Sequence, residues 1–138
     1  MQTKLNPYVN FKDNTRAAML FYQSVFGGEL KMQTFKEYHA SQTPSEDDLI
    51  MHAELDAGGG LMFMASDTPE RMEYRPGNNI TMSLSGDDED QLTTYFRKLS
   101  TDGIVTMLLE KAIWGDTFGM CTDQFGINWL VNIASTKS

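Results

Sequence analysis

The sequence predicts an α+β fold built from two βαβββ modules, in which curved antiparallel or mixed sheets pair around a cleft and helices cover the outer faces. The first observation is that the order strand, helix, strand, strand, strand occurs twice along the 138 residues. The second is a repeated spacing, since Asp13 precedes Phe21-Tyr22 by the same interval that separates Asp87 from Tyr95-Phe96. One helix buries only one face of a sheet, which is why the modules are expected to pair.

The modules are expected at about residues 4–66 and 79–134, within a single domain that takes in residues 1–138. A chain of this length buries a hydrophobic core without disulfides or metals. Each module has a glycine turn that follows an aspartate, at Asp56 and at Asp123. An aspartate in this place bonds the turn backbone through its carboxylate.

In the first module, alternating apolar and polar residues over 5–11 predict a strand. Asp13-Asn14 offers good N-cap residues for a helix whose apolar residues recur at helical spacing up to Gly27-Gly28. A strand follows at 29–34, and the polar segment 37–48 is expected to be a mobile surface loop.

Two strands are then predicted at 49–56 and 61–65, followed by an irregular connection over 66–78. The second module repeats the order with a strand at 80–85 and a helix that starts after the acidic cap Asp87-Asp88. Three further strands complete this module.

The last two strands are expected to form a hairpin around the turn at 123–126. An apolar run leads into the turn at 118–121, and apolar and polar residues alternate after it over 127–133. Trp129 belongs to the apolar side of this alternation and is expected to pack under a helix.

Several segments contain residue patterns that are more specific than their apolar periodicity. The closing part reads Trp-Gly-Asp-x-Phe-Gly (114–119) and Thr-Asp-x-Phe-Gly-x-x-Trp-x-x-Asn (122–132), and the start reads Asn-Pro-Tyr-Val-Asn-Phe-Lys-Asp (6–13). With Met-His-Ala-Glu-Leu (51–55), these segments resemble PhnB-like proteins of the glyoxalase/bleomycin-resistance/extradiol-dioxygenase (vicinal oxygen chelate) superfamily. The resemblance spans roughly residues 4–134 and implies the two-module fold and a homodimer.

Composition and charge exclude some classes of binding partner. The net charge of −8 leaves no Lys/Arg stripe for a phosphate backbone, so no nucleic-acid partner is expected. No apolar run is long enough for a membrane span and the N-terminus is polar, so a cytoplasmic protein without a membrane partner is expected. The charge serves solubility, or it attracts a cationic ligand to an acidic, aromatic cleft. The single cysteine, Cys121, lies in an apolar strand and is expected to be buried and inert.

The superfamily typically holds a divalent metal with His and Glu ligands from four strands, so the resemblance implies where such ligands would fall. The corresponding positions are Asn6 or Pro7, Met62 or Met64, Asn79 or Thr81, and Leu130. Amide, thioether, hydroxyl and isobutyl groups do not hold Mg²⁺, Mn²⁺, Zn²⁺ or Fe²⁺ against water. No metal site and no cofactor are therefore expected.

His52 and Glu54 are the candidate catalytic residues, because they lie two apart in a predicted strand and share one of its faces. They could act as general base and acid, or as two ligands of an unusual metal site. Alternatively, His52 hydrogen-bonds a neighbouring strand or subunit and Glu54 meets solvent. In the first case the pair is expected to point towards Tyr8 and Asn10.

The opposite side of the same strand is apolar. It carries Met51, Ala53 and Leu55, which are expected to pack beneath the first helix.

Methionines are concentrated in the predicted strands, where they fill the core or line a pocket for a flat or hydrophobic ligand together with aromatic residues. The predicted ligand-binding residues are Tyr8, Asn10, His52, Glu54, Met62, Met64, Trp114, Phe118 and Leu130.

Two functions follow from these observations and from the resemblance. The favoured one is metal-independent binding of a small molecule in an aromatic and methionine-lined cleft. The alternative is a metal-dependent vicinal-oxygen-chelate enzyme, a lyase, isomerase or dioxygenase, with non-standard ligands. The sequence leaves open whether a reaction is catalysed and which ligand is bound.

Overall fold

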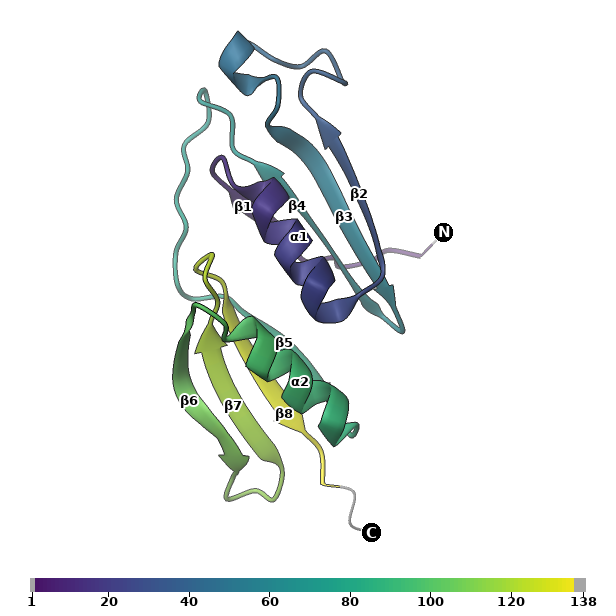
Figure 1. Cartoon of the computed structure of the whole chain (residues 1–138), viewed down its shortest axis with the longest axis vertical. Coiled ribbons are helices and arrows are strands. Elements are labelled where there is room, and N and C mark those ends of the chain that lie inside the picture. Colours follow the sequence, from purple (N-terminus) through teal and green to yellow (C-terminus); the bar gives the residue numbers. More distant parts are fainter. Residues whose placement is uncertain (1, 136–138) are drawn as a thin grey trace. The chain divides into compact units, whose positions relative to one another are not determined.

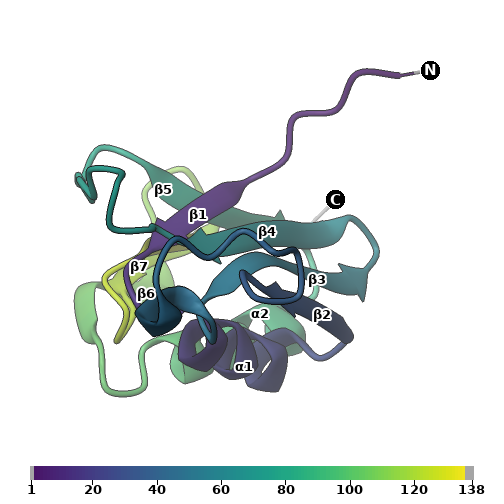
Figure 2. The ribbon, with the colours of Figure 1, turned by 90° about the horizontal axis from the view of Figure 1, so that it is seen from above.

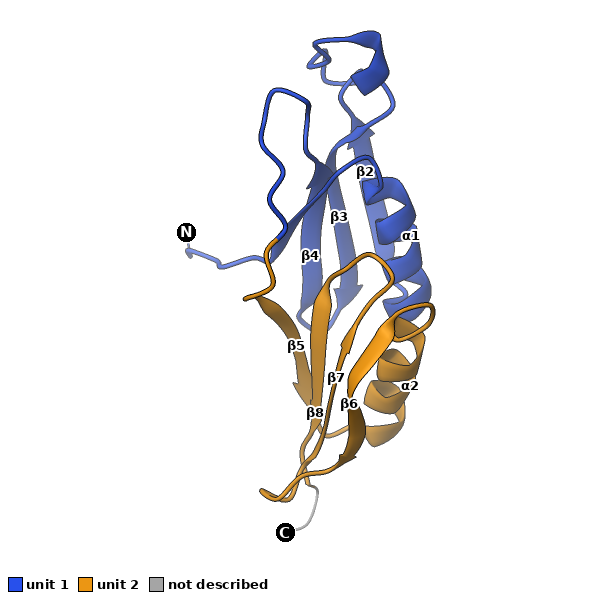
Figure 3. Ribbon diagram, turned by 90° about the vertical axis from the view of Figure 1, so that its left-hand side faces the viewer, with its two compact units in different colours: residues 1–76 blue, residues 77–138 orange. Residues whose placement is uncertain are grey.

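A computed structural model of the chain describes residues 2–135. The chain divides into two compact units, residues 1–76 and 77–138 (Figure 3). The units contain two helices and two four-stranded mixed sheets, which confirms the predicted α+β fold of two modules. Among the described residues, no helix has both the length and the apolar character needed to cross a membrane.

Unit 1 contains five main elements and one short 3-10 helix. They are β1 (Tyr8–Phe11), α1 (Thr15–Phe26), β2 (Glu29–Thr34), the 3-10 helix η1 (Pro44–Glu46), β3 (Ile50–Gly58) and β4 (Leu61–Asp67). The strands lie in the order β1-β4-β3-β2, with β1 parallel to β4 and the other pairs antiparallel. Helix α1 packs on one face of this sheet, against β2, β3 and β4 (Figure 1).

Unit 2 repeats this architecture. Its elements are β5 (Thr81–Gly86), α2 (Glu89–Leu99), β6 (Ile104–Lys111), β7 (Thr117–Thr122) and β8 (Asn128–Ile133). The strands lie in the order β5-β8-β7-β6, again with one parallel pair, β5 and β8. Helix α2 packs against β5, β7 and β8, so the internal repeat predicted from the sequence is present.

Each sheet is covered by its helix on one face only. Seen from above, α1 lies on one side of β3 and β4 (Figure 2). On β3, Ala53 and Leu55 are buried on the helix side, whereas His52 and Glu54 are half-buried on the other side. We call the face opposite the helix the open face of each unit.

Met51 departs from the predicted alternation. It was expected beneath α1, but it is 37% exposed. The reason is a β-bulge. Gln33 pairs with His52 and Thr34 pairs with Ile50, so Met51 has no partner on β2. Ile50 takes the buried place instead.

The start of α1 is held by a carboxylate from another strand. Asn14 is the N-cap residue, but its side chain makes no capping hydrogen bond. Instead, Asp67 at the end of β4 accepts hydrogen bonds from the NH of Thr15 (3.0 Å) and from the NH of Ile50 (2.8 Å). This buried carboxylate therefore joins α1, β3 and β4. In unit 2 the cap is as predicted, since Asp88 accepts from the backbone of α2.

Asp123 organises the β7–β8 hairpin. Its Oδ1 accepts hydrogen bonds from the NH groups of Phe125 (2.8 Å) and Ile127 (3.1 Å), as predicted for this turn. Its Oδ2 accepts from Nε1 of Trp129 (2.8 Å), and both side chains are buried. The equivalent Asp56 is exposed and bonds the backbone of its own turn.

The prediction of a mobile surface loop over 37–48 is wrong in part. The segment contains η1, and Glu46 in it is only 2% exposed. Its carboxylate accepts hydrogen bonds from the NH of Gln42 (3.0 Å) and of Glu70 (3.2 Å). These bonds compensate the burial of the charge and tie the segment to the chain beyond β4.

Replacing Asp123 by alanine is expected to lower the free energy of unfolding by about 3 kcal/mol, since the buried indole NH of Trp129 and two part-buried backbone NH groups lose a charged acceptor. Urea denaturation followed by circular dichroism measures this change. The control is Asp87→Ala at an exposed aspartate of the same unit, which should change the value by less than about 0.5 kcal/mol. Equal stability of both variants would contradict the role given to Asp123.

Candidate functional site

The open face of unit 1 is built from rows of side chains that run across the strands. In the central row, Tyr8 on β1 lies beside Met64 on β4. Met64 in turn lies beside Glu54 on β3, and Glu54 lies beside Lys31 on β2. Side chains that neighbour each other in this way are close enough to contact.

Two further rows flank the central one. One contains the pairs Asn10 with Ser66 and His52 with Gln33, and the other contains Met62 beside Asp56. The structure therefore brings six of the nine predicted ligand-binding residues onto one face. They are Tyr8, Asn10, His52, Glu54, Met62 and Met64.

His52 contacts Tyr8 across this face. The Tyr8 hydroxyl lies 3.3 Å from His52 Nδ1, and the ring centroids are 5.9 Å apart at an angle of 45°. The hydroxyl donates to Nδ1 in the tautomer that carries its proton on Nε2. His52 thus points towards Tyr8, and this contact fits both alternatives drawn from the sequence, a polar residue of the cleft and a residue that bonds another strand.

Glu54 is the half-buried carboxylate of the central row. Its row neighbour Lys31 directs its ammonium group to Glu29 instead, at 3.7 Å. Within residues 2–135, no hydrogen bond or ion pair engages the Glu54 carboxylate. This carboxylate is therefore open to a ligand that carries a hydrogen-bond donor or a positive charge.

The remaining predicted residues lie in unit 2. Leu130 on β8 neighbours Met120 on β7, and Phe118 lies two residues from Met120 on the same face. Trp114 contacts Phe118 edge to face, with centroids 5.4 Å apart at 70°. These apolar and aromatic side chains have polar neighbours on the same face, because Ser83 lies beside Leu130 and Asn132 lies beside Phe118. Trp114 is 59% exposed.

Asp116 lies between Trp114 and Phe118 in the sequence, at the end of the β6–β7 turn. Asp116 accepts hydrogen bonds from Nδ2 of Asn132 (3.0 Å) and from the NH of Ser135 (2.9 Å). The bond from Asn132, and then that from Ser135, hold the pKa of Asp116 below its ordinary value. Asp116 is therefore an anchor of the β6–β7 turn rather than an acid.

The residues at the superfamily's metal positions do not fit a metal. Met64 and Leu130 present a thioether and a hydrocarbon on the open faces, and Thr81 lies beside Asn128. Within residues 2–135, no three His, Cys, Asp or Glu side chains gather as ligands. Divalent metal sites in proteins rely on carboxylate or imidazole donors, so the side chains at these positions do not suit a metal ion.

Cys121 is buried, as predicted. Burial, and secondarily the charge of Asp123, raises the pKa of its thiol, and the hydrogen bond with Ser100 only partly offsets this. A thiol with a raised pKa is a poor nucleophile, so Cys121 is a core residue.

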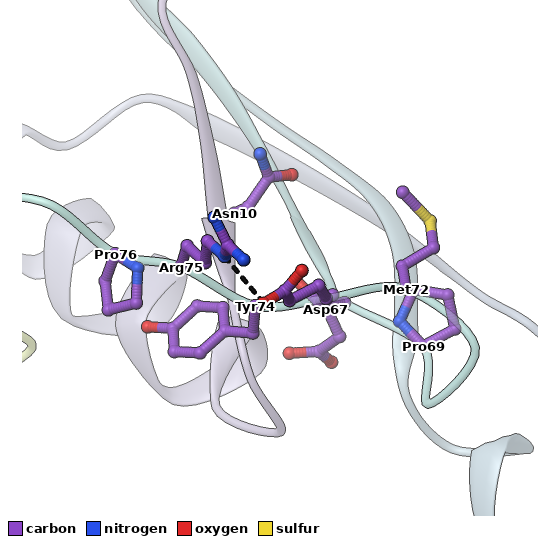
Figure 4. Close-up of a pocket in the computed structure, with 9 residues that line it drawn as sticks. Asn10, Asp67, Pro69, Met72, Tyr74, Arg75 and Pro76 are labelled. Carbon is purple, nitrogen blue, oxygen red and sulfur yellow. Dashed lines mark hydrogen bonds and ion pairs between the residues drawn. The ribbon is translucent and has the colours of Figure 1, made fainter.

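A pocket that the sequence did not predict lies in unit 1 at the carboxyl ends of β1 and β4 (Figure 4). Its volume is about 360 Å³, and most of its wall comes from the connection that follows β4. The lining residues are Asn10, Asp67, Thr68, Pro69, Met72, Glu73, Tyr74, Arg75 and Pro76. Tyr74, a half-buried aromatic ring between polar residues, was the one sequence signal that could have indicated it.

Comparison with known proteins finds relatives of the same length. The chain is 27% identical over 144 residues to protein YjdN of Escherichia coli K12, across 96% of this chain and 97% of that protein. It is similar to the crystal structure of PA1353 from Pseudomonas aeruginosa, with a TM-score of 0.80, 33% identity, and coverage of 96% and 98% of the two chains.

A PhnB protein from Bacillus cereus shares the fold, with a TM-score of 0.77, 23% identity, and coverage of 96% and 100% of the two chains. The sequence model of the Glyoxalase/Bleomycin resistance protein/Dioxygenase superfamily matches residues 4–131, which confirms the resemblance seen in the sequence. This chain therefore belongs to the Glyoxalase/Bleomycin resistance protein/Dioxygenase superfamily.

Proposed function

We propose that the protein binds a small organic molecule on its open face without the help of a metal ion. The observation that carries this proposal is the row of Tyr8, Met64 and Glu54, with His52 in contact with Tyr8. Ligand sites combine apolar and aromatic contact area with a few well-placed polar groups, and this row supplies both.

Each side chain has a distinct role in this proposal. Met62 and Met64 offer flexible, polarisable surfaces that adapt to a flat ligand, and Tyr8 offers an aromatic edge or face. His52 and Glu54 orient the polar groups of the ligand by hydrogen bonds. In unit 2, Trp114 offers a second exposed aromatic surface.

The alternative is a superfamily enzyme with displaced metal ligands. One observation favours this enzyme, namely that His52 and Glu54 share the open face of β3. Two donors on one strand hold a transition metal only if further ligands join them. The donor set at the superfamily positions supports metal-independent binding instead.

Metal content separates the two functions. The protein, expressed without an affinity tag that binds metal, is expected to contain far less than one transition-metal ion per chain by elemental analysis. Native mass spectrometry of the same sample should show the homodimer that we also propose, with no mass added by metal. Near-stoichiometric metal that His52→Ala removes would instead establish the enzyme with displaced ligands.

Replacing His52 by alanine is expected to weaken ligand binding by about 1 to 3 kcal/mol, because a buried polar group of the ligand loses its partner. The melting temperature should change little, since His52 lies outside the helix-covered core. Saturation-transfer NMR with a set of flat aromatic fragments identifies a ligand, and calorimetry gives its affinity.

The matched control is His39→Ala, at the other histidine, which is exposed in the 37–48 segment. This variant should bind as the parent protein does. If His52→Ala unfolds readily yet binds normally per folded molecule, His52 is structural and the proposed site is wrong.

A further inference from the structure

We propose that the pocket at the ends of β1 and β4 is a second binding site, which takes a small organic ammonium ion. The inference goes beyond binding on the open face and stands on the pocket itself. Asn10 is the residue that belongs to both surfaces.

The pocket has room and an apolar wall. Its volume of about 360 Å³ corresponds to roughly a dozen water-sized groups. Pro69 is buried in the wall, and Met72 and Pro76 add apolar surface (Figure 4). An apolar ligand body of a single ring fits a space of this size.

The charges of the lining favour a cation. Asp67 is 3% exposed, and among the described residues its two oxygens accept only backbone NH groups, so no positively charged side chain of that part pairs with it. Arg75 is already paired, because its Nε lies 2.6 Å from Oε1 of Glu73. The lining therefore carries one excess negative charge.

The buried position of the Asp67 carboxylate favours a positively charged ligand over a negatively charged one. An anion that entered the pocket would approach a buried carboxylate, where repulsion is poorly screened, and the net charge of −8 would also oppose it. An ammonium ion is attracted both by this carboxylate and by the net negative charge of the chain. Arg75, whose side chain is 80% exposed, can stay at the rim in water.

Two neutral groups complete the site. Tyr74 lines the pocket with a half-buried ring, and an aromatic ring attracts a cation more strongly as the cation loses its water. The Oδ1 atom of Asn10 accepts a weak bond of 3.4 Å from Ser66 Oγ and can accept a second one from an ammonium group.

The test compares three probes of equal size, benzylammonium, benzoate and benzyl alcohol, by ¹H–¹⁵N NMR titration of the full chain. Benzylammonium is expected to bind most tightly and to shift the amide signals of Thr68, Tyr74 and Arg75. Glu73→Gln should weaken it about two- to fivefold, the range of an exposed charge pair. Arg75→Gln should tighten it by a similar factor, because a competing cation is removed.

His52→Ala separates this proposal from the open-face site, because it should leave benzylammonium binding in the pocket unchanged. Benzoate binding that exceeds benzylammonium binding and is lost in Arg75→Gln would overturn the proposal in favour of an anion site. Equal binding of all three probes, or shifts confined to residues outside 68–76, would also overturn it. Both pocket variants alter exposed side chains, so their folded state is checked by an unchanged melting temperature.

Discussion

Each four-stranded sheet is covered by one helix, so only one of its two faces belongs to the core. The hydrophobic core and the candidate site must therefore be built from the same strands. On β3, the buried Ala53 and Leu55 alternate with the half-buried His52 and Glu54. A slip of one residue would exchange the two sets, so the register of β3 must be fixed firmly. Asp67 fixes it, since its carboxylate binds the first NH of β3 and the first NH of α1 together.

Buried carboxylates act as the anchors of an acidic chain. Asp67, Asp123 and Glu46 are each at most 3% exposed, and each accepts at least two hydrogen bonds from NH groups. Those bonds replace the water that the charges lose on burial. The carboxylates therefore divide into structural ones, whose oxygens are engaged by the backbone or an indole, and available ones such as Glu54, whose oxygens have no partner among the described residues.

Local periodicity was enough to predict both modules and to place six of the predicted residues on the open face of unit 1. Alternation places Tyr8, Glu54 and Met64 on one side of their strands whatever their partners are. The features that were missed depend on contacts between residues distant in sequence. The bulge at Met51 arises from pairing with β2, the burial of Glu46 requires the NH of Glu70, and the pocket forms where the connection after β4 folds back beside Asn10.

We propose that the helix-covered faces hold the fold and that the open faces bind the ligand. Methionine-methyl NMR tests it most directly, because Met62 and Met64 lie on the open face of unit 1 and Met19 is fully buried within α1. With the aromatic fragment that binds most tightly, the methyl signals of Met62 and Met64 should shift while that of Met19 stays in place. A shift of Met19 with unchanged signals of Met62 and Met64 would contradict the account.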